Sequence, residues 1–338
     1  MHILVTGGAG YIGSHVVRQL SQMQDIKITV IDNLCGGYFD SISELKLLFQ
    51  SDRFEFLNVD LNDFGRVEEL FKDSKFDGVI HFAAHLQVGE SVLNPLKYYM
   101  NNTVNTTHLI HMCQKYEVNK FIFSSTAAVY GEPSKMPIRE TTPTAPINPY
   151  GMSKLMSELV LQDAARANQD FKYVILRYFN VAGASMDNSI GECHIHETHL
   201  IPLIVHAAIG KREKIMMFGA DYPTPDGSCI RDYVHVEDLA SAHIQAWHYL
   251  NEGHESDVFN CGYGHGYSVK EVIDMVKRVS GVNFKVEIAL RREGDPAELI
   301  ADNLKIKNIM GWKPKYDDLE LICKNALNWE QKMTKKGT

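Results

Sequence analysis

The sequence predicts an α/β protein in which a Rossmann-type, doubly wound parallel sheet is joined to a smaller mixed α/β domain. Three observations support this fold class. Short β-branched runs alternate with segments of helical periodicity through the first half of the chain. A glycine cluster follows the first of these runs directly. After about residue 180 the pattern becomes irregular, with Gly, Pro, His and acidic residues dispersed, which indicates a second folding unit.

The predicted strands are apolar runs with little polar alternation, which is typical of strands buried on both faces of a parallel sheet. They cover residues 2–6, 26–32, 54–60, 78–83, 120–125 and 173–178. The intervening segments place apolar residues at helical spacing, and we therefore expect right-handed crossovers with helices on both sides of the sheet. One such stripe comprises Met152, Leu155, Met156 and Leu159. We interpret it first as core packing.

The same patterns predict where the domains divide. Residues 1–180 form the expected Rossmann domain and residues 181–338 the smaller domain. Residues 234–249 resemble a strand end followed by a helix, and we expect residues 234–262 to return to the first domain.

Composition argues against several kinds of partner. The chain has 338 residues, with 34 Lys and Arg against 42 Asp and Glu, and a formal net charge of −8 at pH 7, which does not favour nucleic acid or an anionic membrane. No apolar stretch approaches the roughly 18 to 20 residues that span a bilayer. The six cysteines form no C-x-x-C pair and no basic leader precedes the first strand, so we expect a cytoplasmic protein with reduced thiols.

The glycine cluster has the spacing G-x-x-G-x-x-G at residues 7–13 and opens a helical pattern. A dinucleotide pyrophosphate needs backbone amides at a helix N-terminus and no side chain in its way. Asp32 ends the second predicted strand, 19 residues after Gly13, where a carboxylate accepts both ribose hydroxyls and repels a 2′-phosphate. The sequence therefore predicts binding of NAD rather than NADP.

A second constellation indicates acid–base chemistry. Tyr150 and Lys154 are four residues apart on a helix that follows Asn148, and a run of hydroxyl residues that includes Thr126 ends a predicted strand. A free tyrosine titrates near pH 10, so a base near neutrality needs a pKa shift of roughly three units, or about 4 kcal/mol. We expect the Lys154 ammonium and the positive nicotinamide ring to favour the phenolate.

With these residues in view, the chain is identified as a member of the extended short-chain dehydrogenase/reductase family over nearly its whole length. The similarity rests on residues 7–13, 32–34, 81–84, 88–91, 124–131, 150–154, 176–180, 226–227, 231–236 and 291–295. Within the family, the chain most resembles the enzymes that invert C4 of UDP-hexoses. The resemblance implies interconversion of UDP-galactose and UDP-glucose, and leaves open whether UDP-N-acetyl sugars also react.

The implied reaction has no net redox change. Tyr150 removes the proton of the 4-hydroxyl while the C4 hydride passes to NAD, and the 4-keto sugar turns over and takes the hydride back on its other face. In this scheme Thr126 bonds the 4-oxygen, Lys154 holds the nicotinamide ribose and tunes Tyr150, and UDP tethers the intermediate.

Motifs and resemblance together assign two sets of binding residues. The cofactor set is Gly7, Gly10, Tyr11, Ile12, Gly13, Asp32, Asn33, Asp60, Leu61, Phe82, Ala83, Ala84, Asn101, Ser124, Tyr150, Lys154, Tyr178 and Phe179. The substrate set, which the resemblance alone implies, is Thr126, Asn180, His199, Leu200, Phe218, Arg231, Arg292, Asp295 and Leu299. The two guanidinium groups suit a diphosphate because they offer forked donors, the phenylalanine suits uracil stacking, and the aspartate suits ribose hydroxyls.

Three positions depart from the family pattern. Leu86 replaces a lysine near the cofactor, His199 replaces an asparagine that touches substrate, and Leu299 replaces a bulky tyrosine beside the sugar C2 substituent. The resemblance also implies a homodimer, in which the helix at residues 96–113 and the Met152 to Leu159 stripe face the partner subunit.

Three other interpretations are weaker. The run at residues 193–199 contains Cys and His, but it falls on the expected substrate loop and the predicted chemistry needs no metal, so we predict none. A 4,6-dehydratase or decarboxylase of the same fold needs an acid beside Thr126, where this chain has Ala127 and Ala128. A non-catalytic NAD sensor would not need Thr126, Tyr150 and Lys154 together.

Overall fold

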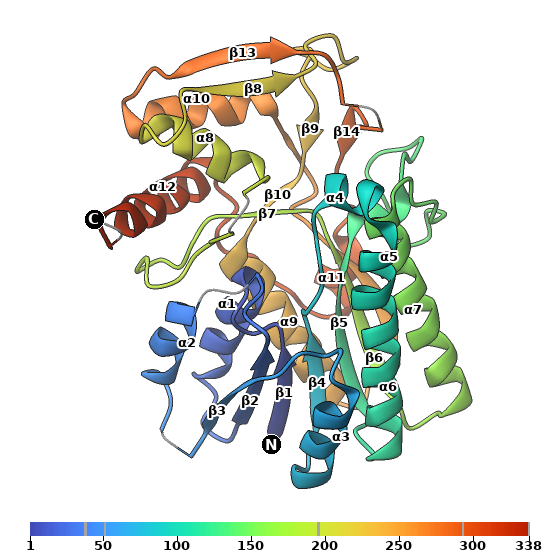
Figure 1. Cartoon of the computed structure of the whole chain (residues 1–338). Helices are drawn as coiled ribbons and strands as arrows, with labels where there is room; N and C mark the ends of the chain where they lie inside the picture. The colour runs from blue at the N-terminus through green and yellow to red at the C-terminus, as the bar shows by residue number, and fades with distance from the viewer. Residues whose placement is uncertain (37–38, 51, 195–196, 293, 337–338) are drawn as a thin grey trace.

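The computed structural model describes residues 1–36, 39–50, 52–194, 197–292 and 294–336. At its centre is a seven-stranded parallel sheet with the strand order β11-β6-β5-β4-β1-β2-β3 (Figure 1). The strands are β1 (His2–Thr6), β2 (Lys27–Asp32), β3 (Phe54–Asn58), β4 (Gly78–His81), β5 (Lys120–Thr126), β6 (Lys172–Tyr178) and β11 (Asp257–Cys261). The predicted fold class is confirmed. The third and fourth strands end earlier than predicted, so Asp60 lies in the loop after β3.

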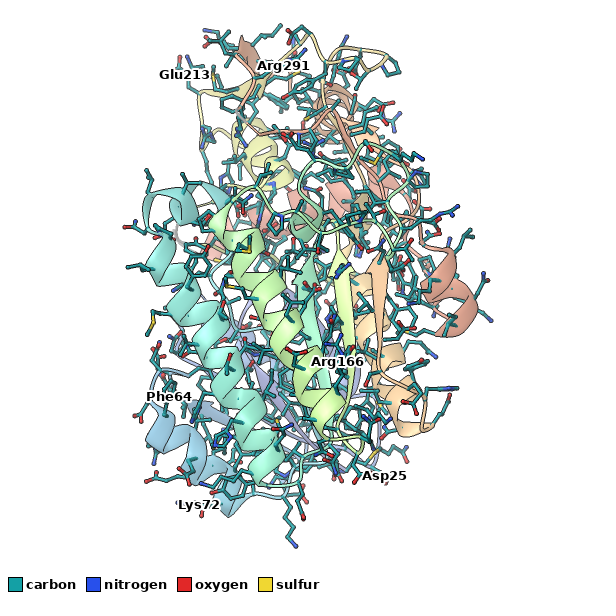
Figure 2. The ribbon with its side chains drawn as sticks, turned by 90° about the vertical axis from the view of Figure 1, so that its right-hand side faces the viewer. Asp25, Phe64, Lys72, Arg166, Glu213 and Arg291 are labelled. Carbon is teal, nitrogen blue, oxygen red and sulfur yellow. The ribbon has the colours of Figure 1, made fainter. Side chains whose placement is uncertain are left out.

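Both faces of the sheet are buried, as continuous apolar runs predict. Ile3 and Val5 belong to one core cluster, whereas Leu4 between them belongs to the other. The first face is covered by α1 (Tyr11–Leu20), α2 (Phe39–Lys46) and α9 (Val236–Asn251), and the second by α3 (Phe64–Asp73), α6 (Asn105–Lys115) and α7 (Pro149–Ala167). In Figure 2, α6 and α7 lie side by side on the face of the molecule that is nearest the viewer. Phe64 is at one end of α3, and Arg166 is near the end of α7.

The helix expected over residues 96–113 is interrupted. The chain forms α4 (Val88–Leu93), α5 (Pro95–Tyr98), a π-helical segment η1 (Tyr99–Val104) and then α6. A π-helical turn inserts an extra residue and turns the side chains relative to a regular helix. Here it places Asn102 inside, where the side chain of this residue bonds the backbone of His85 and the hydroxyl of Ser153.

Core packing was the wrong interpretation for much of the stripe on α7. Met156 and Leu159 are exposed, and the buried face of this helix is instead largely polar. Ser153 and Ser157 lie on this face, and their hydroxyls bond backbone carbonyls of α7 and, for Ser157, of Asn102. Small polar side chains let α7 and η1 approach closely. This face of α7 therefore packs through hydrogen bonds, whereas the periodicity suggested apolar contacts.

The rest of the chain builds a second lobe above the carboxyl edge of the sheet (Figure 1). It contains α8 (Leu200–Ala208), β8 (Lys214–Phe218), α10 (Val269–Ser280), β13 (Lys285–Ala289) and α12 (Leu319–Lys336). Short strands connect the lobes: β7 (Asn180–Ala182) pairs with β10 (Tyr233–His235), and β9 (Ile230–Arg231) lies between β12 (Tyr267–Ser268) and β14 (Glu298–Leu299). Two short helical segments complete the described elements: the 3₁₀ segment η2 (Ala127–Tyr130) and the helix α11 (Leu304–Ile309).

The segment after β10 runs back to the sheet. Helix α9 packs against α1, and β11 pairs in parallel with β6 from Asp257 onward. The two-domain division remains a proposal, with residues 234–262 assigned to the first domain. Within the described residues, no helix is both long enough and apolar enough to cross a membrane.

Candidate active site

The glycine loop connects β1 to α1 at the carboxyl edge of the sheet, where parallel α/β folds bind ligands. Gly7 has a φ of +72°, and a Cβ on it would lie 2.6 Å from the backbone nitrogen of Ala83. A Cβ on Gly13 would lie 2.3 Å from the carbonyl oxygen of Gly7. Both positions therefore require glycine. The side-chain-free backbone that results, at the N-terminus of α1, suits a pyrophosphate.

Asp32 supports this loop from the end of β2. Its carboxylate accepts hydrogen bonds from the backbone nitrogens of Ala9 at 3.0 Å and Leu34 at 2.8 Å. Burial raises the pKa of Asp32, and the two amide hydrogen bonds oppose that rise. Beside it, the Asn33 side chain donates to a carboxylate oxygen of Asp60 at 2.8 Å. Asp32 and Asp60, which the sequence placed at the ends of two predicted strands, are thus linked through Asn33 at the same edge of the sheet. The Asp32 carboxylate is the group that an adenosine ribose would use.

The predicted acid–base residues converge where β5, η2 and α7 meet. Thr126 is the last residue of β5, and its hydroxyl accepts a hydrogen bond from the backbone nitrogen of Ala128, capping η2. Asn148 caps α7 by accepting from the backbone nitrogen of Gly151, which sets the position of Tyr150 in the first turn. The Thr126 hydroxyl also lies near the phenol of Tyr150, close enough to lower its pKa. A substrate hydroxyl in this place would meet both.

The environment of Tyr150 differs from the sequence expectation. Burial raises the pKa of its phenol, and the nearby Thr126 hydroxyl only partly opposes the rise. Burial also lowers the pKa of the Lys154 ammonium, to about 7, and Glu158 opposes that shift. The positive nicotinamide ring of bound NAD would favour the phenolate of Tyr150.

Lys154 is fixed by the strand next to it. Its Nζ donates a hydrogen bond of 2.8 Å to the backbone carbonyl of Ser124 and lies 4.9 Å from the ring centre of Phe123. The hydroxyl of Ser124 bonds that of Tyr178 at 2.8 Å. Three residues assigned to the cofactor, namely Ser124, Lys154 and Tyr178, are thereby brought together.

Sequence reasoning missed the buried ion pair beneath this group. Glu158 is fully buried and accepts from Nε of Arg177 at 3.0 Å and from the hydroxyl of Ser125. Arg177 also donates to the hydroxyl of Tyr130 at 3.0 Å. The network joins α7, β5, β6 and η2 under the reacting residues. A lysine and a glutamate four residues apart on one helix face were the available signal.

The remaining predicted cofactor residues lie around the carboxyl edge of the sheet, and their contacts with NAD stay a prediction. The Tyr11 hydroxyl has a partner within the protein, because it donates a hydrogen bond of 2.6 Å to the carbonyl of Gly183. Ile12 and Phe82 pack against the first core cluster, Ala83 against the second, and Leu61 is buried within the second. Ala84 follows the end of β4, Asn101 lies in η1, Phe179 is buried after β6, and Gly10 caps α1. The departure at Leu86 is partly exposed.

Five of the predicted substrate residues come from four segments: β7, β8, β9 and the segment before β14. Arg231 on β9 is buried and forms an ion pair with Asp295, while Arg292 lies 4.0 Å from the ring centre of Phe218 at the end of β8. Asn180 begins β7, and its backbone nitrogen donates to the carbonyl of Asp232. Arg231, predicted to bind the diphosphate, and Phe218, predicted to stack on uracil, thus each contact another predicted substrate residue. Glu293 of the same motif lies outside the described residues.

The last three substrate residues frame the site. His199 caps α8 and Leu200 is its first residue. Leu299 on β14 is paired with Arg231 and packs against the cluster that contains Tyr130 and Phe179. The site has a further support that the sequence did not suggest: Asp232 is buried and accepts from three backbone nitrogens, those of Tyr263, Gly264 and Ala301.

Residues 3–262 match the NAD dependent epimerase/dehydratase family. The UDP-glucose 4-epimerase of Halalkalibacterium halodurans is 47% identical over 331 residues, which are 98% of this chain and 96% of that protein. The UDP-Glc/GlcNAc 4-epimerase of Campylobacter jejuni is 57% identical, with a TM-score of 0.86 over 98% of this chain and 99% of the other. The UDP-glucose-4-epimerase of Stenotrophomonas maltophila, solved with bound NAD and formylated UDP-arabinopyranose, is 37% identical, with a TM-score of 0.94 over 99% of each chain.

Proposed function

Because the chain belongs to the NAD dependent epimerase/dehydratase family, we propose that Thr126, Tyr150 and Lys154 carry out the reaction of a UDP-glucose 4-epimerase, with NAD as the cofactor. The enzyme is an isomerase that interconverts UDP-galactose and UDP-glucose. The observation that supports the residue roles is the closeness of the Thr126 and Tyr150 side chains at the carboxyl end of β5. A base and a hydrogen-bonding hydroxyl arranged in this way would both reach one substrate oxygen.

The protein's own residues perform the proton transfers. Tyr150 takes the proton of the sugar 4-hydroxyl as the C4 carbonyl forms and returns it when the hydroxyl is restored. Thr126 holds the 4-oxygen in both directions, and Lys154 holds the nicotinamide ribose beside Tyr150. Bound NAD supplies the acceptor that takes the C4 hydride and gives it back to either face of the 4-keto sugar.

The fit to a dinucleotide rests on two features of this chain. The backbone of the glycine loop is bare at the N-terminus of α1, where Cβ atoms on Gly7 and Gly13 would collide with backbone. Asp32 keeps an ionisable carboxylate at the ribose position. Gly7, Gly10 and Gly13 therefore bind the pyrophosphate, and Asp32 with Asn33 binds the adenosine ribose and disfavours a 2′-phosphate.

The second lobe retains the nucleotide. Arg231, held by Asp295, and Arg292, stacked on Phe218, provide guanidinium groups for the diphosphate. Asn180, His199, Leu200 and Leu299 line the sugar side. Retention of UDP lets the 4-keto sugar turn over without leaving.

A dehydratase or decarboxylase would need a further acid at the sugar. Glu158 contacts the end of β5, but it is fully buried and its carboxylate is bonded to Arg177 and Ser125. A carboxylate held in this way does not suit the role of that further acid, which favours epimerisation. A non-catalytic sensor is disfavoured by the intact pairing of Thr126 with Tyr150.

The function is tested by incubating pure protein with UDP-galactose or UDP-N-acetylgalactosamine without added NAD and resolving the products. Appearance of UDP-glucose supports the proposal. An NAD-bound protein that is inert toward every UDP-sugar would contradict it.

The proposed assembly is a homodimer formed through α4 to α6 and α7. Exposed apolar side chains gather on these helices: Val92, Leu93, Leu96, Met100, Met156 and Leu159. Apolar side chains that are scattered singly on a surface are common, but a group such as this one indicates an interface. The double change Leu96→Glu and Leu159→Glu should yield a monomer in sedimentation, whereas Leu290→Glu in the second lobe, at a side chain that is 90% exposed, should not. The proposed location is the cytoplasm, which suits the six free cysteines.

A further inference from the structure

Four side chains on the segment between β7 and α8 converge on one point. They are Glu192, His194, Glu197 and His199. One ligand atom from each, a carboxylate oxygen or an imidazole nitrogen, lies within 4.8 Å of the others. We refer to these four residues as the His–Glu cluster.

The cluster is cross-connected. Nδ1 of His199 lies 2.5 Å from Oε1 of Glu192 and 3.6 Å from Oε1 of Glu197. Nδ1 of His194 lies 3.3 Å from Oε1 of Glu192 and 3.2 Å from Oε2 of Glu197. Two separate ion pairs would need one contact each, yet here both imidazoles present the same ring nitrogen to both carboxylates.

We propose that the His–Glu cluster binds a Zn²⁺ ion. Four ligands at about 2.0–2.1 Å from a tetrahedral zinc lie about 3.3 Å from one another, and three of the four distances above are within about 0.3 Å of that spacing. Two imidazoles with two carboxylates form a donor set that suits zinc, whereas calcium and magnesium prefer oxygen donors alone. The two glutamates also balance the charge of a divalent cation.

The surroundings orient the donors. The side chains of Glu192 and Glu197 are only 4% and 8% exposed. The backbone carbonyl of Glu192 accepts from Nε1 of Trp329 on α12 at 2.7 Å, and Oε1 of Glu197 accepts from the backbone nitrogen of His199 at 2.7 Å. Supporting hydrogen bonds of this kind fix metal ligands in place.

The site gives a structural role to the run at residues 193–199, for which the sequence predicted no metal. The missing donor was Glu192, which precedes the run and turns inward after the isolated bridge between Ala184 and Gly191. Cys193 takes no part in the cluster, and Ile195 and His196 lie outside the described residues. A zinc ion here ties the loop to the start of α8. Because His199 coordinates through Nδ1, its Nε2 stays available on a ring that is 43% exposed.

The first test uses the untagged full chain, cleared of metal with a chelator and titrated with Co²⁺. A tetrahedral site produces intense visible absorption that saturates near one equivalent and disappears when Zn²⁺ is added. Weak absorption of the octahedral type, or none, would overturn the proposal without any variant.

The second test compares ligand and control variants by competition for Zn²⁺ and by metal analysis. His194→Ala and Glu192→Gln should each weaken zinc binding by at least about a hundredfold. His206→Ala is the matched control, because it removes another part-buried histidine that faces a carboxylate, Glu330, and it should bind zinc as the wild type does. Circular dichroism and UDP binding report whether each variant is folded. Wild-type affinity in both ligand variants, or equal loss in His206→Ala, would refute the site.

Discussion

The Nζ atom of Lys154 donates a hydrogen bond of 2.8 Å to the backbone carbonyl of Ser124, which holds the first turns of α7 against the carboxyl end of β5. This contact sets Tyr150, one helical turn earlier, beside Thr126 at the end of the same strand. The same burial that fixes Lys154 lowers the pKa of its ammonium to about 7. Placement and charge at this site are therefore coupled.

Tyr150→Phe tests the base. Removing the phenol should lower kcat by at least about a hundredfold, because we assign to it the transfer of the 4-hydroxyl proton, while UDP affinity measured by calorimetry stays close to that of the wild type. Tyr98→Phe is the control: its ring centre lies 6.4 Å from that of Tyr150, but its hydroxyl donates to Gln87 and Glu90. This control should keep most of its turnover. Near-wild-type kcat in Tyr150→Phe would remove the residue from the mechanism.

Lys154→Met tests the effect of burial on charge in cofactor-free protein. The folded pKa of Lys154 is about 7 and its ordinary value is 10.5, so the unfolded chain binds more protons between these values. Folding of the wild type is therefore penalised by this group below pH 7, and the penalty falls as pH rises toward 10.5, on the order of 1 kcal/mol per pH unit.

Methionine lacks this penalty at every pH. In urea titrations, the free energy of unfolding of the variant minus that of the wild type should be larger at pH 6.5 than at pH 9, so the variant gains more stability at the lower pH. Lys172→Met, at the surface-paired start of β6, reports the effect of losing any lysine charge. A pH-independent difference for Lys154→Met would show that the ammonium is not desolvated.

Asp32→Ala tests the cofactor rim. The carboxylate accepts from the amides of Ala9 and Leu34, so its loss should loosen the glycine loop and weaken NAD binding by about tenfold or more in stripped enzyme, while discrimination against NADP falls. Asp63→Ala is the matched control, since Asp63 bonds the backbone nitrogen of Arg66 at the start of α3. Equal activity of the wild type with NAD and NADP would disprove the role of Asp32.

Leu299→Tyr tests sugar breadth. Leu299 stands where the resemblance implies a bulky tyrosine beside the sugar C2 substituent, and the relative from Campylobacter jejuni is a UDP-Glc/GlcNAc 4-epimerase. We expect the wild type to accept UDP-N-acetylgalactosamine, and the variant to lose about tenfold or more of kcat/KM for that sugar while keeping UDP-galactose. Leu304→Tyr, on the exposed side of α11, should change neither. A wild type inactive on the N-acetyl sugar, or a variant equally good on both, would show that Leu299 does not set the pocket's width.

Local sequence determined the elements and the residues that local geometry demands. The strands of the central sheet follow from short apolar runs, Gly13 from the carbonyl oxygen of Gly7 that leaves no space for a Cβ, and the spacing of Tyr150 and Lys154 from the helix repeat. These features depend on neighbours a few residues away, so the order of residues alone predicts them.

Tertiary structure decided what surrounds each group. Asp295 pairs with Arg231 across 64 positions, β11 joins the sheet from residue 257, and burial weakens the charge of Lys154, which the sequence assumed to be full. The exposed Met156 and Leu159 and the convergence of Glu192 with His199 belong to the same class. Burial, pKa and pairing depend on which distant segments pack together, and hydrophobic periodicity carries no information on that choice.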